Sequence, residues 1–187
     1  MNNYDLPTSL TVGGVGYSIR YGWRHVINVL IACADPLISR RAKRAIIVRV
    51  MYPEWKKIPP EHIQEAVEKA NDFIDCGQVK TGGNKPKLID WEQDGSIIIP
   101  EINKVAGTEI RLNPDIHWWT VFGWFMGIEK GILANVLRIR KKLADGEPLD
   151  KYEREYYTNN HTLIDFDQPY TEGQAEAIRD VMEWMEG

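Results

Sequence analysis

The sequence has only two cysteines and no hydrophobic run of membrane-spanning length. Cys33 and Cys76 form neither a disulfide framework nor a zinc-binding pair, so we expect both to be reduced core residues of a cytosolic protein. A membrane-spanning helix needs about 20 apolar residues in succession, and no segment offers them. Residues 1–7 also lack the basic region and the hydrophobic stretch of a secretion signal. These absences predict a soluble protein that stays inside the cell that makes it.

The motifs of catalytic and cofactor-binding sites are also missing. Gly13, Gly14 and Gly16 do not open a helix as a dinucleotide fingerprint requires, and residues 82–85 lack the Lys-Ser/Thr pair of a phosphate-binding loop. None of the histidines has a metal-ligating partner four positions along the chain: His25, His62, His117 and His161. No nucleophile stands beside a base that could activate it. We therefore expect no enzyme, no cofactor and no metal, and interpret His117 as a hydrogen-bonded histidine at the end of a core helix.

Three carboxylates lie close together at Asp90, Glu92 and Asp94. Paired carboxylates can act as acid and base where their surroundings separate their pKa values. These three precede a predicted helix at a spacing of two, so they more simply cap that helix and meet its dipole. We favour capping over catalysis.

Charge is divided unevenly along the chain. Residues 1–87 hold 13 Lys and Arg against 8 Asp and Glu, whereas residues 88–187 hold 10 against 19. A solvated acidic surface or a partner-binding tail would each explain the acidic half. Basic runs at 40–44 and 138–142 could meet phosphate, although the second falls in the last turn of a predicted helix, where cations are favourable. The acidic half would repel a polyanion, so nucleic-acid binding is the weaker hypothesis.

Apolar spacing predicts a mainly α fold: a compact multi-helix domain with an N-terminal β-hairpin and a C-terminal docking helix. The hairpin turns at Gly13-Gly14. Residues 40–52 fit a strand or a helix, and we favour a helix. Pro100 is expected to kink its helix or to delay its start. Four further helices are expected in the first part of the chain: from Trp23 to Asp35-Pro36, from Pro60 to Gly77, from the segment after Asp94 to Gly107, and from Asn113 to Ile128. Three more are expected from Ile132 to Asp145-Gly146, from Pro148 to Tyr157 and from Thr171 to Met185. In the helix from Pro148, we expect Leu149, Tyr152 and Tyr156 to be buried.

Two of these helices need a partner surface. In the helix at 113–128, Asn113 is expected to cap and Pro114 to occupy the first turn, and a helix that is apolar on nearly every side must be surrounded by its own fold or by another chain. The C-terminal helix is expected to begin with a capping box at 171–174 and to dock through its apolar stripe. We expect residues 1–158 to form the helical domain, and residues 159–187 to form an acidic, irregular linker followed by this amphipathic helix.

An ordered set of sequence features runs from Leu6 to Tyr157. The most specific are an Asp-aromatic-Glu-Gln-Asp box at 90–94 and a His-Trp-Trp motif at 117–119. Weaker features accompany them in order along the chain: Leu6-Pro7 with the hairpin, Tyr21-Gly22-Trp23-Arg24, Asp35-Pro36, Tyr52-Pro53, Cys76-Gly77 and Arg154-Glu155-Tyr156-Tyr157. This set resembles the Gp-fifteen family of long-tailed bacteriophages. The chain departs from the family pattern at Pro100, at the glycines of 82–83 and in a segment appended from about residue 160.

The resemblance implies a largely helical accessory protein encoded near the major tail and tape-measure proteins. A tail assembly chaperone of this kind would bind the tape-measure protein in the cytoplasm of the infected bacterial host and leave as the tube polymerises. Two alternatives stay open: a structural tail or connector protein retained in the virion, and a DNA-binding regulator that uses residues 40–44.

Two apolar surfaces are candidates for binding another polypeptide. The first is a wall of Trp118, Trp119, Trp124 and Phe125, for which plain core is the alternative. The second is the C-terminal stripe of Ile178, Val181, Met182, Trp184 and Met185. Methionine suits adaptable surfaces, yet this stripe would equally fit docking on its own domain or self-association with a second copy.

Overall fold

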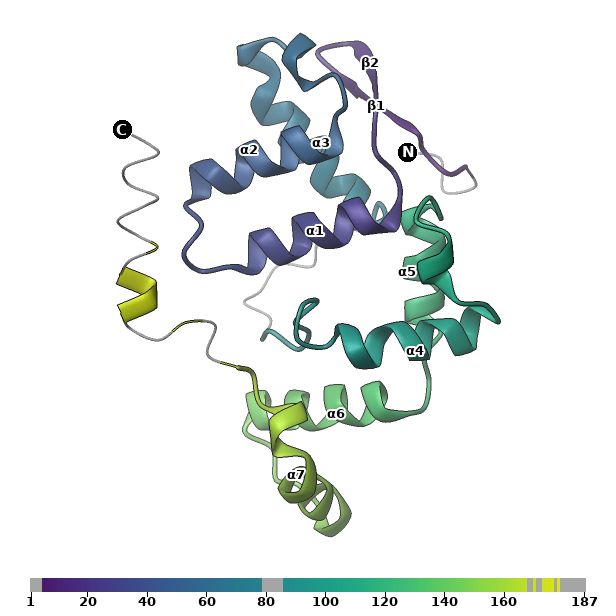
Figure 1. Cartoon of the computed structure of the whole chain (residues 1–187), viewed down its shortest axis with the longest axis vertical. Coiled ribbons are helices and arrows are strands. Elements are labelled where there is room, and N and C mark those ends of the chain that lie inside the picture. Colours follow the sequence, from purple (N-terminus) through teal and green to yellow (C-terminus); the bar gives the residue numbers. More distant parts are fainter. Residues whose placement is uncertain (1–4, 79–85, 168–169, 171–172, 177, 179–187) are drawn as a thin grey trace.

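The computed structural model describes residues 5–78, 86–167, 170, 173–176 and 178. The fold is mainly helical with a two-stranded antiparallel sheet near the N-terminus, as the sequence predicted (Figure 1). The strands are β1 (Ser9–Val12) and β2 (Val15–Ser18). The helices are α1 (Trp23–Ala34), α2 (Arg40–Met51), α3 (Ile63–Ile74), α4 (Gly95–Ala106), α5 (Trp118–Met126), α6 (Ile132–Asp145) and α7 (Lys151–Ile164). Short 3-10 helices lie at Trp55–Lys57, Pro60–His62 and Ile110–Leu112.

The hairpin forms where the sequence predicted it and packs on α3. Gly13 and Gly14 have φ of 56° and 78°, values that glycine adopts without the steric cost of a Cβ. Leu10 and Val12 face the core, and the backbone N–H of Gly13 donates a hydrogen bond to Glu65 of α3 at 2.9 Å. A two-stranded hairpin is marginal by itself in water, so its stability comes from this packing.

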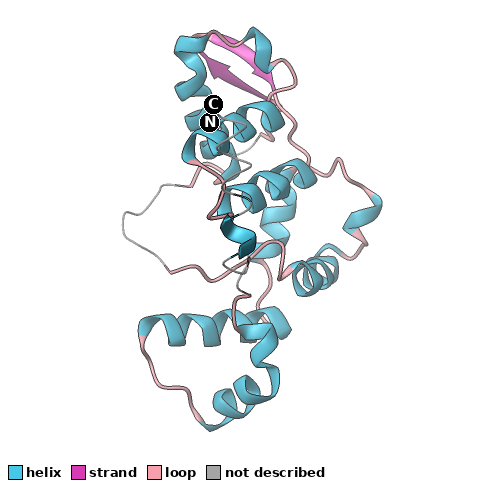
Figure 2. Ribbon diagram, turned by 60° about the vertical axis from the view of Figure 1, so that its left-hand side comes forward, coloured by secondary structure: helices cyan, strands magenta, loops and turns pink. Residues whose placement is uncertain are grey.

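Helices α1 to α3 form one end of the molecule together with the hairpin, and α6 and α7 form the other (Figures 1 and 2). Between them lie α4 and α5. The hairpin and helices α1 to α5 contribute most residues of the main core. Val136, Ile139 and Ile164 form a second small cluster between α6 and α7. Tyr52 is fully buried at the end of α2 and donates a hydrogen bond to the carbonyl of Ala66 at 2.9 Å.

Residues 40–51 form helix α2, so the favoured interpretation of this segment is confirmed. Ser39 caps the helix by accepting a hydrogen bond from the backbone N–H of Ala42 at 3.1 Å. Ile47, Val48 and Met51 are buried on one helical face. Burial of these side chains in the tertiary fold therefore stabilises the helix, and it outweighs the weak preference of the β-branched residues for strands.

The predicted start of the tryptophan helix is wrong. Asn113 accepts a hydrogen bond from the backbone of Asp115 in a short turn, and α5 begins only at Trp118, where His117 caps it. The cause is a long-range pairing: Trp118 N–H donates to Tyr21 at 2.8 Å, and Trp23 N–H donates to Ile116 at 3.0 Å. These bonds hold the segment before α5 extended against the start of α1. The fold of the chain itself does not surround the helix on every side, since Met126 is 61% exposed.

The predicted end of the next-to-last helix is also wrong, and its predicted buried face is wrong at Tyr152, whereas Leu149 and Tyr156 pack against the cluster between α6 and α7. Helix α7 runs to Ile164, with a kink at Asn160, so residues 158–164 are helical and the expected domain boundary after residue 158 falls inside it. Tyr152, expected inside, is 80% exposed, whereas Glu153 is buried. The Glu153 carboxylate pairs with Lys142 at 2.7 Å and with Arg138 at 3.3 Å, so two cations of α6 compensate its burial.

Two of the predicted helix stops fall on glycines, as expected. Gly107 and Gly146 end α4 and α6 in the left-handed conformation, with φ of 68° and 72°. Pro100 lies inside α4 without delaying its start at Gly95. Of the expected C-terminal helix, residues 173–176 and 178 are helical, and the rest lies outside the described residues.

Two glycines give opposite predictions for substitution by alanine. Gly131 has φ of 127°, and a Cβ there would lie 2.7 Å from the buried Glu101 carboxylate, so Gly131→Ala should destabilise the protein by about 1–3 kcal/mol. Gly123 lies inside α5 with nothing within 4 Å of an added Cβ, so Gly123→Ala should stabilise it by about 0.5–1 kcal/mol. Urea unfolding of both variants measures the change in the free energy of unfolding. A change of the same sign in the two variants would contradict these predictions.

Candidate functional site

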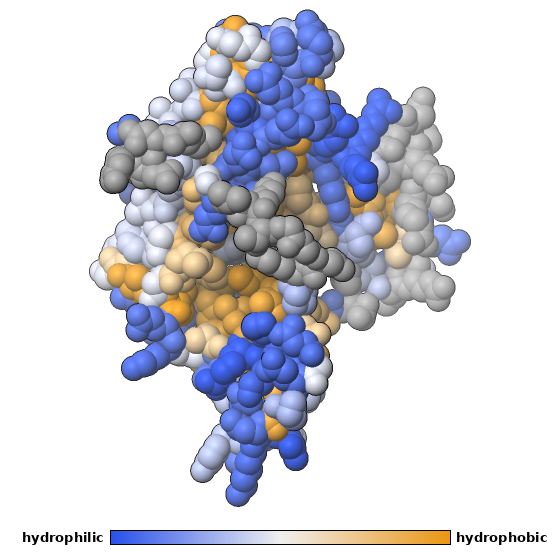
Figure 3. Space-filling model, turned by 180° about the vertical axis from the view of Figure 1, so that it is seen from behind, coloured by the Kyte–Doolittle hydropathy of each residue, from blue (hydrophilic) through white to orange (hydrophobic). Residues whose placement is uncertain are grey.

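A groove of about 430 Å³ lies between α1 and α4, at the middle of the molecule. Its lining is mainly apolar and comes from three helices and two connecting segments: Trp23, Arg24, Ile27, Asn28, Trp91, Gly95, Ile98, Ile99, Ile102, Arg111 and Val121. Figure 3 shows hydrophobic side chains gathered in a hollow in the middle of one face of the molecule, between largely hydrophilic surfaces above and below it. On this face the apolar surface is thus concentrated in the middle of the molecule.

Two arginines border the groove, and they differ in how their charge is compensated. Arg111 donates to the Glu109 carboxylate at 2.8 and 2.6 Å, and these bonds hold the pKa of Glu109 at about 2. Arg24 stacks over the Trp23 ring at 5.3 Å and donates to the backbone carbonyl of Arg111 at 2.7 Å. Among the described residues Arg24 has no acidic partner, so it is the uncompensated cation of this rim.

The four residues of the predicted aromatic wall have different environments. Trp118 is 1% exposed and donates its Nε1–H to the carbonyl of Ile74 at 2.8 Å, so it belongs to the core. Trp119 is half-buried and donates to Phe73 at 2.8 Å. Trp124 and Phe125 are also half-buried against the core. Their apolar contacts attach α5 to α3 and α4, and only part of the wall remains open to solvent.

Sequence reasoning overlooked Trp91, which connects this wall with the groove. Its ring packs edge-on against Trp118 at 5.9 Å and tilted against Phe125 at 5.4 Å, and its side chain also lines the groove. The signal was present in the sequence as the aromatic residue of the 90–94 box. The chemical interpretation of that box rests on its carboxylates alone, and it does not include the contribution of Trp91 to the apolar surface.

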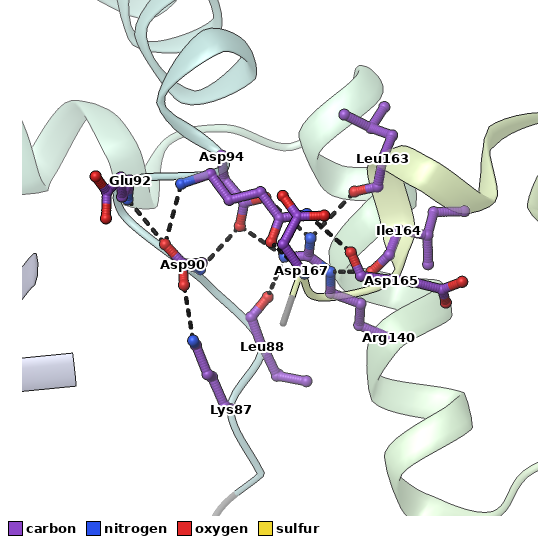
Figure 4. A network of polar contacts seen from close by, with 11 residues as sticks. Lys87, Leu88, Asp90, Glu92, Asp94, Arg140, Leu163, Ile164, Asp165 and Asp167 are labelled. Atoms are coloured by element: carbon purple, nitrogen blue, oxygen red, sulfur yellow. Dashed lines mark hydrogen bonds and ion pairs between the residues drawn. The ribbon is translucent and has the colours of Figure 1, made fainter. Parts of the chain in front are cut away.

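The carboxylate of Asp94 belongs to a buried ion pair, which corrects the capping interpretation for this residue. Arg140 of α6 donates to both of its oxygens, at 2.6 and 2.9 Å, and both side chains are at least 97% buried (Figure 4). Arg140 also donates to the carbonyls of Leu88, Leu163 and Ile164 at 2.9, 3.1 and 2.6 Å. The pair therefore joins the start of α4, the middle of α6 and the end of α7.

The other polar residues of the box hold neighbouring backbone. Asp90 caps the turn before α4, accepting from Glu92 and Gln93 at 2.9 and 3.0 Å. Burial raises the pKa of Asp90, but these bonds and one from Lys87 outweigh it and lower the pKa below its ordinary value. Gln93 bonds to the backbone of Asp165 and of Asp167, at 2.8 and 3.1 Å (Figure 4). These bonds position the chain after α7. Asp90 and Glu92 of the box line a pocket of about 400 Å³ together with Asp35 and Asp167.

His117 caps α5, and we expect protein stability to fall as the pH drops below about 6.5, the ordinary histidine value. Its Nδ1 accepts from the N–H of Trp119 at 3.1 Å, and its Nε2 bonds the carbonyl of Pro7 at 3.0 Å. Burial lowers the pKa of His117, with the Pro7 bond opposing, so the unfolded chain takes up the proton first. His117→Asn keeps a capping oxygen and should flatten thermal stability between pH 7 and 5.

The control for this prediction is His161→Asn at an exposed position in α7. It should leave the pH profile of the melting temperature unchanged. A profile that stays equally steep in His117→Asn would contradict the assignment to His117.

The two cysteines and the possible metal ligands can be located within the described residues. Cys33 and Cys76 are free and half-buried, and burial raises the pKa of both thiols, that of Cys76 to about 12. In the described ranges, no group of three or more His, Cys, Asp and Glu residues is arranged to hold a metal ion. None of the helices seen there combines the length and the apolar character that crossing a membrane requires.

The predicted C-terminal stripe is seen only at its first residue. Ile178 is helical and half-buried. The remaining members, Val181, Met182, Trp184 and Met185, lie outside the described residues.

Comparison of the chain with models of known protein families finds no match, and searches of curated proteins and of solved structures find no similar protein.

Proposed function

We propose that this protein is a non-enzymatic tail assembly chaperone of a long-tailed bacteriophage, and that it binds the tape-measure protein through the groove between α1 and α4. The groove carries the proposal, because it joins an apolar floor to an uncompensated cation at its rim. The resemblance of the 90–94 box and of the His-Trp-Trp motif to the Gp-fifteen family supports the same assignment.

The groove suits the apolar face of a helix. Recognition of an amphipathic helix uses a hydrophobic groove that takes side chains spaced three and four residues apart. Ile98 and Ile102 form part of the floor from α4, and Ile27 faces them from α1. Arg24 would then meet a carboxylate on the polar edge of the client. This division between an apolar floor and a charged rim matches the anatomy of protein interfaces.

Co-expression with the tape-measure protein encoded beside it tests the proposal. Asn28 is exposed on the groove lining, so Asn28→Trp fills the groove from the surface without disturbing the core. We expect co-purification of the client with the wild type and at least about tenfold weaker binding with this variant, as for blocked hot spots in interfaces. Arg24→Glu should weaken binding as well.

Asn159→Trp is the matched control, since it makes the same substitution at an exposed position in α7. It should bind the client as the wild type does. Full binding by Asn28→Trp would refute the groove as the site, and no co-purification with the wild type would refute the chaperone function.

The two alternatives predict different results. A structural tail or connector protein would be found in purified virions in stoichiometric amounts. A DNA-binding regulator is favoured by the exposure of Arg40, Arg41 and Arg44 on α2, and predicts DNA affinity that falls steeply with salt. Absence of DNA binding at low salt would dismiss that alternative.

A further inference from the structure

Three exposed apolar side chains lie where α4 ends, α5 ends and α6 begins. Val105, Met126 and Ile132 are 43%, 61% and 48% exposed. Single exposed apolar residues are normal on a protein surface, but a group that three helices bring together indicates a binding surface. Figure 1 shows the end of α4 and the start of α6 on the same side of the molecule. We call these three residues the apolar end patch.

Close backbone contacts hold the three helix ends together. A Cβ added to Gly127, the residue after α5, would lie 3.3 Å from the Val105 side chain. A Cβ added to Gly131, the residue before α6, would lie 2.7 Å from the carboxylate of Glu101, which is one turn before Val105 on α4. Both glycines therefore let the connection between α5 and α6 approach α4 closely. Because packed backbone holds the patch in place, binding there costs little ordering of the chain.

The connection between α5 and α6 adds one charge of each sign beside this patch. Glu129 and Lys130 are both exposed, and within the described ranges neither makes an ion pair. The other charges nearby compensate each other, since Lys104 pairs with Glu101 at 2.8 Å within α4. The rim of the patch thus offers a carboxylate and an ammonium group that the described residues leave unpaired.

A second copy of this chain has the chemistry that this surface requires. In a two-fold dimer both copies present the same patch, so a contact of one residue with another occurs twice, once in each direction. Adjacent residues of opposite charge satisfy this rule, because Glu129 of each copy can face Lys130 of the other. The rim has no net charge, so contact there adds no like-charge repulsion, although each chain carries a net charge of −4.

We propose that the protein self-associates as a two-fold dimer through the apolar end patch, whose three side chains pack against those of the second copy. Glu129 of each copy pairs with Lys130 of the other. None of these five residues lines the groove between α1 and α4, so the inference goes beyond the proposed function and does not depend on it. A patch of three apolar side chains is small for an interface, so the dimer is in reversible equilibrium with the monomer.

Sedimentation velocity of the full chain over a range of protein concentrations tests the proposal. We expect the wild type to pass from monomer to dimer as the concentration rises. V105K/M126K should raise the dissociation constant at least about tenfold, because it brings like charges together in the contact. Both substitutions lie at exposed positions in the last turns of helices, where a cation is favourable for the dipole, so the fold is retained.

The matched control is V15K/L143K, which changes the net charge equally at exposed apolar positions on the hairpin and near the end of α6. It should dimerise as the wild type does. A wild type that stays monomeric at every concentration would overturn the proposal. So would a dimer that V105K/M126K leaves unchanged, since that result would assign the contact to another surface.

Single charge reversals test the two-fold pairing. Glu129→Lys places lysine opposite lysine in the dimer, and Lys130→Glu places glutamate opposite glutamate, so each variant alone should dimerise more weakly than the wild type. An equimolar mixture of the two variants should form mixed dimers, because each copy then meets the opposite charge. A mixture that associates no more than either variant alone would contradict the two-fold contact.

Discussion

Replacing Arg140 by methionine should destabilise the protein by about 3–5 kcal/mol, because it leaves the fully buried Asp94 carboxylate without its cation. Three backbone carbonyls also lose a donor, at Leu88, Leu163 and Ile164. Methionine fills much of the volume of the arginine stem, so the loss reports the charge more than a cavity. Urea unfolding followed by circular dichroism measures it as a lower midpoint at unchanged m.

Lys141→Met is the matched control on the neighbouring residue. Lys141 pairs with Asp145 at 2.6 Å, but its side chain is 64% exposed, and exposed pairs contribute about 1 kcal/mol or less. A second comparison is the double variant Asp94→Leu with Arg140→Met. The double variant should lose less free energy of unfolding than the two single variants lose together, because neither charge is then buried alone. Equal losses for Arg140→Met and Lys141→Met would contradict the structural importance of the buried pair.

Trp118→Ala should cost about 3–5 kcal/mol, the range for removing a large aromatic side chain from a core. The residue is 1% exposed, and its ring contacts Trp91 and Phe122 at centroid distances of 5.9 and 5.6 Å. Its removal would therefore loosen the contact of α5 with α3 and with the segment before α4. Thermal and urea unfolding of the variant measure the effect.

Trp118→Phe separates the hydrogen bond from the packing. It keeps most of the ring but leaves the carbonyl of Ile74 without the Nε1–H donor, which should cost about 1–3 kcal/mol. Trp119→Ala is the control within the same motif, since Trp119 is only half-buried. A loss in Trp118→Ala no larger than in Trp119→Ala would show that Trp118 does not dominate this contact.

Local sequence signals were sufficient for the hairpin and for most helices. The hairpin depends on two adjacent glycines with positive φ, and the ends of α4 and α6 depend on Gly107 and Gly146 in the same conformation. These features depend on the sterics of one or two residues, so the sequence alone can indicate where they occur. The groove was not predicted, because its walls come from α1 and α4, which are separated by some sixty residues of chain.

The basic run at 138–142 illustrates the limit of local reasoning. We interpreted it as cations favourable in the last turn of a helix, and Lys141 and Lys142 are partly exposed there. Arg140, one residue away, is instead buried against Asp94. Burial of a cation depends on whether another element brings a carboxylate to it, and no spacing within α6 reports that.

The sequence by itself determined the mainly α composition, the hairpin turn and the glycine stops of α4 and α6, because propensity, periodicity and positive φ act over a few residues. Only the tertiary structure decided where α5 begins, which side of α7 is buried and which of the aromatic residues stay partly open. Each of these depends on partners far along the chain: Tyr21 for Trp118, Lys142 for Glu153 and Trp91 for Phe125. Long-range hydrogen bonds and ion pairs override local preference, since a buried polar group left without its partner costs more than a helix turn contributes.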